Sequence, residues 1–274
     1  AARLRIYPDR CLLSITHKAS SKTFSIACPL RSDSPDDTPA YPADLTMQGI
    51  APPGHILDHL LIFALSGAAV GKGILLIHAS TIRYRGKAVM FLGESGTGKS
   101  THTRLWREHI PGAELLNDDS PIVRIVQTAD ADPICGAVQN PANAPIAAAE
   151  TPDASAATTG APVKPQAMVF GAPWSGKTPC YRNVCQPIRA IVRLSQAPHN
   201  RIRRLRAIEA IGALLPSCPP SFAHDETLED AVCATVSAVV AQVPVYHLEC
   251  RPDAAAAELA CRTIFGGESA NPRP

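Results

Sequence analysis

Apolar and polar positions along the chain follow two periods, one typical of strands and one typical of helices. Alternation of period two predicts strands at residues 4–7, 11–15 and 24–27, and a three-to-four spacing predicts a helix over 56–70. Further along, the same patterns predict strands at 74–80, 88–92, 114–119, 121–126, 167–170, 188–194, 202–205 and 245–250, and helices at 101–110, 208–215, 227–243 and 253–264. Strands and helices mixed in this order indicate an α/β fold with a mixed β-sheet.

The composition divides the chain into two parts. Residues 1–53 are expected to form a small β-rich segment that packs on the core and ends in a Pro-, Asp- and Ser-rich loop over 31–53. Residues 54–274 are expected to form one domain. Within it, residues 128–166 contain almost no large apolar side chain, so they cannot bury enough surface to offset their ordering entropy. We therefore expect a flexible insertion at 128–166.

Residues 93–100 read GESGTGKS, which is a phosphate-binding loop motif between a predicted strand and a predicted helix. Its glycines allow backbone N–H groups to turn toward a polyphosphate, and the following helix points its positive end at the same place. Lys99 would reach the β- and γ-phosphates, and the Ser100 hydroxyl would bind Mg²⁺. The motif predicts binding of ATP and Mg²⁺. The candidate nucleotide-binding residues are Gly93, Glu94, Ser95, Gly96, Thr97, Gly98, Lys99, Ser100 and Thr101.

Asp118 and Asp119 end the predicted strand that follows the loop helix, and this strand could run beside the one that enters the loop. Carboxylates at this place can hold Mg²⁺ or take a proton from an attacking hydroxyl. Neighbouring side chains on a strand point to opposite faces, so the two have separate roles unless the strand has already ended. A pair that only caps a turn is the alternative.

His78 lies in an apolar strand expected to form a hairpin with the strand that enters the phosphate loop. That hairpin would bring the imidazole close to the γ-phosphate. A buried core histidine is the alternative.

Residues 171–178 read GAPWSGKT and fit the same motif, but their surroundings argue against a second nucleotide site. Pro173 removes a backbone N–H donor from the loop. Pro179 and the residues after it are a poor sequence for the start of a helix. We interpret this segment as a loop facing the substrate, in which Lys177 and Arg182 bind a phosphate or carboxylate. A plain surface turn is the alternative.

The charge and cysteine content exclude several classes of function. A formal net charge of +2 and a pI of about 8.1 give no basis for a nucleic-acid surface. The one dense basic run, Arg201 to Arg206, is expected to be a solvated strand edge, and a ligand site is the alternative. The sequence contains no apolar run long enough for a membrane span. The nine cysteines lack the spacing of a metal site, which favours reduced thiols and a cytoplasmic location.

Taken together, His78-Ala79-Ser80, residues 93–101 and Asn117-Asp118-Asp119 resemble the nucleotide site shared by HPr kinase/phosphorylase and ATP-dependent phosphoenolpyruvate carboxykinase. The stretches 74–124 and 171–193 resemble small bacterial HPr-kinase-like proteins. The resemblance implies a mixed β-sheet P-loop domain of this type.

By the same resemblance, Thr97 and Lys99 would bind phosphate oxygens, with His78 beside the γ-phosphate or the metal. Ser100 would hold the metal together with Asp119, and Asp118 would act as the base. The resemblance also implies self-association into a homo-oligomer.

These observations predict an ATP- and magnesium-dependent phosphotransferase, a kinase that moves the γ-phosphoryl group to a hydroxyl of a protein, a peptide or a small molecule. Two alternatives remain open at this point. One is a reduced enzyme resembling phosphoenolpyruvate carboxykinase, and the other is a regulator that binds ATP without catalysis. Neither nucleic acid nor a membrane is expected as a partner.

Overall fold

A computed structural model describes residues 2–6, 10–16, 21, 23–29, 44–46, 54–126, 165–176, 178–218 and 226–266. The strands are β1 (Ala2–Ile6), β2 (Arg10–Thr16), β3 (Thr23–Pro29), β4 (Asp44–Thr46), β5 (Ile74–Leu76), β6 (Ala79–Tyr84), β7 (Lys87–Leu92), β8 (Glu114–Asn117), β9 (Ile122–Val126), β10 (Gln166–Phe170), β11 (Cys185–Gln196), β12 (Arg201–Arg204) and β13 (Val245–Cys250). The helices are α1 (Gly54–Val70), α2 (Lys99–His109), α4 (Ala207–Leu214), the 3₁₀ turn η3 (Leu215–Ser217), α5 (Glu226–Gln242) and α6 (Ala254–Phe265).

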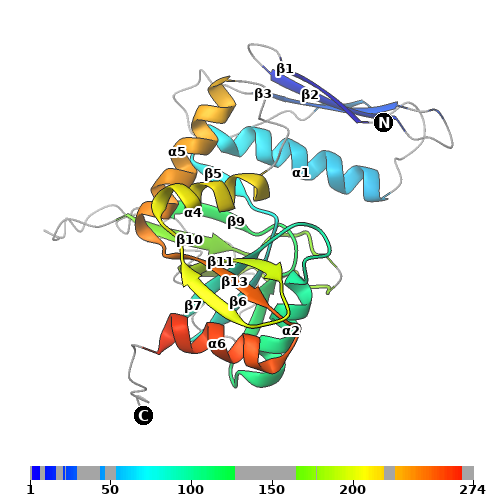
Figure 1. The fold of residues 1–274 in the computed structure, drawn as a ribbon. Helices are drawn as coiled ribbons and strands as arrows, with labels where there is room; N and C mark the ends of the chain where they lie inside the picture. The colour runs from blue at the N-terminus through cyan, green and yellow to red at the C-terminus, as the bar shows by residue number, and fades with distance from the viewer. Residues whose placement is uncertain are drawn as a thin grey trace, which may run out of the picture.

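The N-terminal strands form an antiparallel four-stranded sheet in the order β1-β2-β3-β4. Helix α1 lies against β2 and β3 and connects this sheet to the rest of the molecule (Figure 1). The three strands predicted before residue 30 are confirmed. The prediction of loop throughout 31–53 is wrong at β4, which pairs with Ser25–Ala27 of β3. The composition of residues 31–53 does not predict this pairing, because the hydrogen bonds that make β4 a strand come from β3.

The main sheet is mixed, has nine strands and curls into a half-barrel. Its order is β5-β9-β10-β11-β7-β6-β8, and β13 adds to β11 and carries β12 at its outer edge. Strand β11 runs parallel to both β7 and β13. The carboxyl ends of β7, β11 and β13 therefore lie at one edge of the sheet, which is where α/β proteins place their ligands. The predicted α/β fold with a mixed sheet is confirmed.

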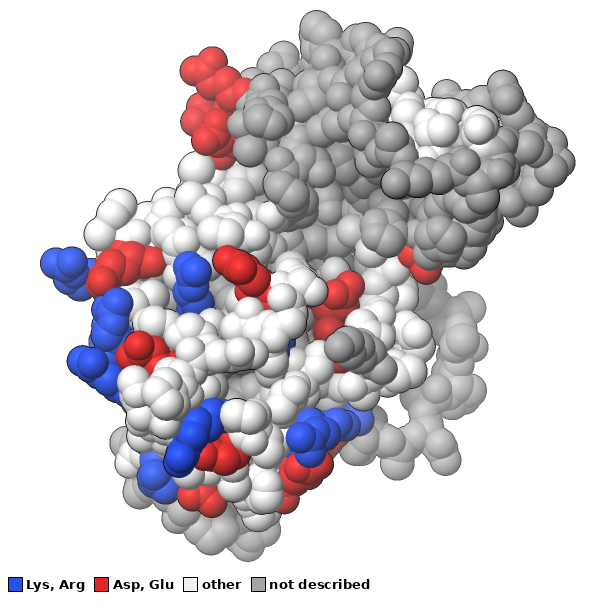
Figure 2. Space-filling model, turned by 45° about the vertical axis from the view of Figure 1, so that its right-hand side comes forward, with Lys and Arg blue, Asp and Glu red and all other residues white. Residues whose placement is uncertain are grey.

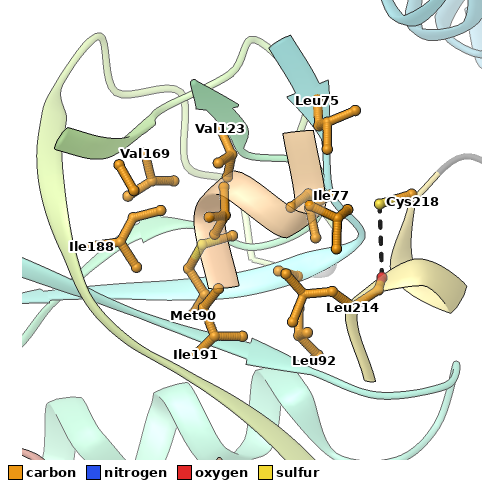
Figure 3. Close-up of a cluster of buried hydrophobic side chains, with 14 of the residues drawn as sticks. Leu75, Ile77, Met90, Leu92, Val123, Val169, Ile188, Ile191, Leu214 and Cys218 are labelled. Atoms are coloured by element: carbon orange, nitrogen blue, oxygen red, sulfur yellow. Dashed lines mark hydrogen bonds between the residues drawn. The ribbon is translucent and has the colours of Figure 1, made fainter. Parts of the chain in front are cut away.

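Helices cover both faces of the central strands, which explains the unbroken apolar run in β7. Ala88, Met90 and Leu92 point into the core under α1, α4 and α5, whereas Val89 and Phe91 point into the core over α2 and α6. Figure 3 shows part of the first core, where side chains of β7 and β11 meet Leu214 of α4. A strand buried on both faces has no polar side, so its sequence lacks alternation.

Two predictions about neighbouring strands need correction. Residues 74–80 form two strands instead of one, because backbone N–H groups at the junction bond to separate segments: Ile77 to Pro121, His78 to Ser217 and Ala79 to Asp119. His78 therefore lies in the bend before the hairpin β6–β7 rather than within a strand. Strand β8, expected beside the loop strand, pairs with β6 instead.

Residues 127–164, which make up most of the predicted insertion, lie outside the described residues; β10 begins at Gln166. Among the described helices, none has both the length and the apolar character needed to cross a bilayer. On the face drawn in Figure 2, basic and acidic side chains are interspersed. The expectation of reduced thiols fails at Cys185, which is disulfide-bonded.

Candidate active site

The glycine-rich motif forms the connection between β7, which ends at Leu92, and α2, which begins at Lys99. Gly96 and Gly98 have φ angles of 84° and 105°, a region that side chains with a Cβ rarely adopt. Thr97 closes the turn, since its backbone N–H and its hydroxyl both donate to the Glu94 carbonyl, at 3.1 and 2.7 Å. The glycines thus permit a tight loop that other residues could not form without strain.

Among the described residues, no side chain caps the first turn of α2. Gly98 is the N-cap and has no side chain to accept the first helical N–H groups, and the first turn contains no acidic residue. Unsatisfied N–H groups and the helix dipole together favour an anion at this end. The loop therefore has the backbone arrangement that phosphate binding requires.

The Lys99 ammonium lies across the first half of the loop. Its Nζ donates to the carbonyls of Gly93 at 2.8 Å and Glu94 at 3.3 Å. Burial lowers the pKa of Lys99, and the nearby carboxylates of Asp119 and Asp118 oppose that shift. The structure thus brings the lysine and the aspartate pair, far apart in sequence, into one electrostatic environment.

Asp118 follows the end of β8 and is 4% exposed. Its two carboxylate oxygens accept hydrogen bonds from the Ser80 hydroxyl at 2.8 Å and the Thr178 backbone N–H at 3.0 Å. Ser80 also bonds the Thr103 hydroxyl of α2 at 3.0 Å, and Thr103 donates to the Ser100 carbonyl. A continuous polar chain therefore connects Asp118 with the start of the loop helix.

Asp119 lies beyond the strand end and is more accessible than its neighbour. The Asn117 side chain ends the strand by accepting from the N–H groups of Asp119 and Ser120 at 2.9 and 3.0 Å. The Asp119 side chain is 36% exposed, and one oxygen lies 3.9 Å from Nε2 of His78. The two aspartates therefore face different surroundings, as expected for a strand that has just ended.

His78 is exposed on the same side as Asp119, so it is not a buried core histidine. Burial lowers its pKa, the Lys99 charge lowers it further, and Asp119 raises it. The neutral form is therefore favoured, and a neutral imidazole can accept or donate a proton near the ammonium of Lys99.

The described residues of the second motif-like segment, 171–176 and 178, lie against the end of β8. No helix follows it within the described residues 178–184, as expected from Pro173 and Pro179. Asn117 donates to the Trp174 carbonyl at 2.9 Å, and a Cβ added at Gly176 would lie only 2.7 Å from the Asp118 carbonyl. The segment therefore packs directly against the aspartate pair.

The two residues expected to bind substrate from this segment do not both fall at the site. Lys177 lies outside the described residues. Arg182 pairs with Glu114 at 2.6 Å, and Glu114 also binds Arg83 at 2.8 Å. Glu114 is the first residue of β8, whereas Asp118 follows the last residue of this strand. The ion pair therefore holds Arg182 at the end of β8 opposite to the aspartate pair, and the structure does not bring it to the loop.

Two pockets flank the glycine-rich loop and share Gly96, Thr97, Leu194 and Gln196. The arginine pocket, of about 700 Å³, lies on the α4 side. It is lined by residues 93–97, Arg193, Ser195, Arg203, Glu209 and His247. The α2 pocket, of about 630 Å³, lies on the other side. It is lined by Gly98, Thr101, Leu105, Gln196, Arg251 and Pro252.

Sequence reasoning did not find the pocket-lining residues outside the motif. Among them, Arg193, His247 and Arg203 come from β11, β13 and β12, and only strand pairing brings these three together. The signal available was a polar residue within an otherwise apolar predicted strand, as at Arg193 and His247.

Among the described residues, no group of three or more His, Cys, Asp or Glu side chains forms a metal site by itself. Ser100 and the aspartates offer oxygen donors, which Mg²⁺ prefers, and such sites usually complete their coordination with substrate phosphates and water. Comparison with known proteins adds no relative, since neither a family model nor a curated protein matches the chain.

Proposed function

We propose that this protein is an ATP- and Mg²⁺-dependent phosphotransferase. The observation that carries the proposal is the convergence of three features on one ammonium group. Lys99 spans a glycine loop at an uncapped helix start, while Asp119 and His78 lie within its electrostatic reach. A loop that only binds phosphate has no need for a carboxylate and an imidazole beside its lysine.

The contacts of Lys99 also support one orientation of the nucleotide. The lysine of such loops reaches the β- and γ-phosphates. Lys99 bonds Gly93 and Glu94, which line the arginine pocket and not the α2 pocket. We therefore assign the γ-phosphate end to the arginine pocket. The nucleoside would enter the α2 pocket, where Leu105 and Pro252 offer apolar surface to a base.

For the two aspartates, the surroundings favour the opposite of the division expected from the sequence. Asp118 is buried and connected through Ser80 and Thr103 to the helix start, which suits a residue that holds Mg²⁺ with Ser100. Asp119 is accessible and lies beside His78, which suits the residue that takes the proton of the acceptor hydroxyl. Bound Mg²⁺ would supply charge stabilisation for the transferring phosphoryl group.

During transfer, the chain's own groups would neutralise the charge that develops on the phosphoryl oxygens. The loop N–H groups and Lys99 are held in place before reaction, so they cost no reorganisation in the transition state. The acceptor oxygen bonds to phosphorus, the bond to ADP breaks, and Asp119 receives the proton.

The test compares Lys99→Ala with Lys87→Ala, which removes a lysine from the opposite end of β7. We expect ATP·Mg²⁺ binding by calorimetry, and turnover of ATP with hydroxyl acceptors, to be lost in Lys99→Ala and kept in Lys87→Ala. Undiminished turnover in Lys99→Ala would overturn the proposal. Binding without any turnover in the wild type would favour the regulator instead.

A further inference from the structure

Three strands place a row of basic and imidazole side chains beside the phosphate loop. In the sheet register, Leu92 of β7 pairs with Arg193 of β11, Arg193 pairs with His247 of β13, and His247 pairs with Arg203 of β12. Paired residues on adjacent strands point to the same face. Because Gly93 follows Leu92 directly, one end of this row of paired residues lies beside the first residue of the loop. Figure 1 shows β7, β11 and β13.

On this face of the sheet, the side chains change from apolar to polar between one row of paired residues and the next. Ile191 and Val245, the pair before Arg193 and His247, are buried in the core under α4. The next pair on this face is Ser195 and Glu249, so the face is polar from Arg193 onward. The change coincides with the floor of the arginine pocket.

Arg193 is partly buried, and its side chain forms no hydrogen bond or ion pair with another described residue. Arg203 pairs with Glu209 at 3.1 Å, but this pair is exposed, and exposed pairs contribute little. Glu209 also binds Arg206, so it can keep a partner if Arg203 turns into the pocket. Two guanidinium groups thus flank the pocket, and that of Arg193 forms no ion pair with another described residue.

Ser195 and His247 complete the wall with a hydrogen bond of 2.9 Å between the hydroxyl and Nε2. Burial lowers the pKa of His247, Glu249 raises it, and Arg203 and Arg193 lower it further. A neutral imidazole adds no charge, so the pair offers directional hydrogen bonds to a hydroxyl or carbonyl beside the arginines.

We propose that the arginine pocket is the acceptor site and that the acceptor is a small hydroxylated anion. Its carboxylate or phosphate group would bind Arg193 and Arg203. Its hydroxyl would point out of the pocket past Gly93 and Glu94, toward Lys99 and the neighbouring Asp119, which do not line the pocket themselves. This inference rests on the proposed function. A volume of about 700 Å³ is the size of a small-molecule site, and planar guanidinium groups match the oxygens of such anions.

The first experiment measures binding by calorimetry, so that it does not depend on knowing the natural acceptor. The wild type is saturated with ADP·Mg²⁺, which occupies the phosphate loop, and is then titrated with inorganic phosphate, glycerate or glycerol. Glycerate and glycerol both carry hydroxyls, but only glycerate has a carboxylate. We expect phosphate and glycerate to bind and glycerol not to bind.

Three variants locate the site. Arg193→Gln and Arg203→Gln should each weaken phosphate and glycerate binding by roughly tenfold or more, as expected for a lost charge-assisted hydrogen bond. Arg204→Gln is the control: Arg204 pairs with Tyr246, so it lies on the opposite face of the same strand. All three should bind ADP·Mg²⁺ like the wild type.

Equal binding of glycerate and glycerol, no binding of either anion at millimolar concentration, or an unaffected Arg193→Gln variant would overturn the inference. Failure of the proposed function would look different, because the wild type would then not bind ADP·Mg²⁺ in the first titration. The Lys99→Ala variant separates the two further, since it should lose ADP·Mg²⁺ and still bind phosphate through Arg193.

Discussion

Adjacent residues can have unlike surroundings, as Asp118 and Asp119 show. The carboxylate of Asp118 is buried and accepts from Ser80 and Thr178, whereas that of Asp119 is partly exposed and faces His78. A buried carboxylate that accepts two hydrogen bonds contributes to stability, because its donors would otherwise be unsatisfied. An exposed one contributes little to stability and is free to react.

We therefore predict that Asp118→Asn and Asp119→Asn differ in kind. The amide of Asp118→Asn would present a donor to the Ser80 hydroxyl or to the Thr178 N–H, and stability should fall by about 1–3 kcal/mol. Asp119→Asn should keep the unfolding free energy of the wild type and lose ATP turnover. Urea unfolding and a turnover assay on both variants check this. An unchanged unfolding midpoint in Asp118→Asn would contradict it.

Among the individual residues of the candidate site, the sequence pointed to those that are contiguous in the chain. It missed those that come together only after folding. The loop residues 93–101 form a local motif, so their arrangement follows from their order. Arg193 and His247 lie on separate strands, and no spacing in the sequence connects them. The role expected for Arg182 relied on interpreting its segment as a loop that faces the substrate, whereas Glu114, a residue distant in the sequence, is its partner.

At the scale of elements, residues 171–176 and 178–180 depend on contacts with β8 and its end instead of on regular structure. Asn117 and Asp118 bond its backbone at Trp174 and Thr178, and the Cys180 thiol lies against the Leu116 carbonyl at 3.3 Å. Gly176 lets this segment approach the Asp118 backbone closely. The packing of an irregular segment thus fixes the aspartate pair from one side.

This close approach predicts the effect of Gly176→Ala. Its Cβ would lie 2.7 Å from the Asp118 carbonyl oxygen, so the segment must move away, at a cost of about 1–3 kcal/mol. Turnover should fall with it. Gly212→Ala, in the exposed part of α4 with no atom within 4 Å of the new Cβ, should stabilise the protein by about 0.5–1 kcal/mol. Thermal unfolding of both variants decides, and equal midpoints would contradict the argument.

Local periodicity predicted most elements well, including β7, α2 and β13, because each contains its own pattern of apolar positions. It was harder to predict which strands lie side by side. The split of 74–80 into β5 and β6, and the position of β8 beside β6, are set by hydrogen bonds to distant segments. The residues within these strands do not indicate which distant segments they will bond.

At the scale of the whole molecule, the sheet separates two cores, and one of them contains a buried histidine. His102 of α2 is 3% exposed, packs edge-on against Phe91 at 4.7 Å between ring centres, and accepts from the Trp106 indole N–H at 3.2 Å. Burial lowers its pKa from 6.5 to about 4. Folding therefore depends on keeping this imidazole neutral.

The sign of the pH dependence follows from that shift. Between pH 6.5 and 4 the unfolded chain binds a proton at His102 that the folded protein does not, so stability is fully present above pH 6.5 and falls as the pH approaches 4. A difference of this size corresponds to about 3 kcal/mol between pH 7 and 4. The lowered pKa values of His78 and His247 act in the same direction.

His102→Gln isolates this contribution, because glutamine does not titrate and can still accept from Trp106. We expect the loss of unfolding free energy from pH 7 to pH 4 to be about 3 kcal/mol smaller in the variant than in the wild type. Carboxyls with lowered pKa values, such as Glu114 and Asp253, lose stabilisation equally in both proteins and cancel in the difference. Denaturant unfolding at several pH values measures it. Parallel curves for the two proteins would mean that His102 is protonated in the folded state as readily as in the unfolded chain.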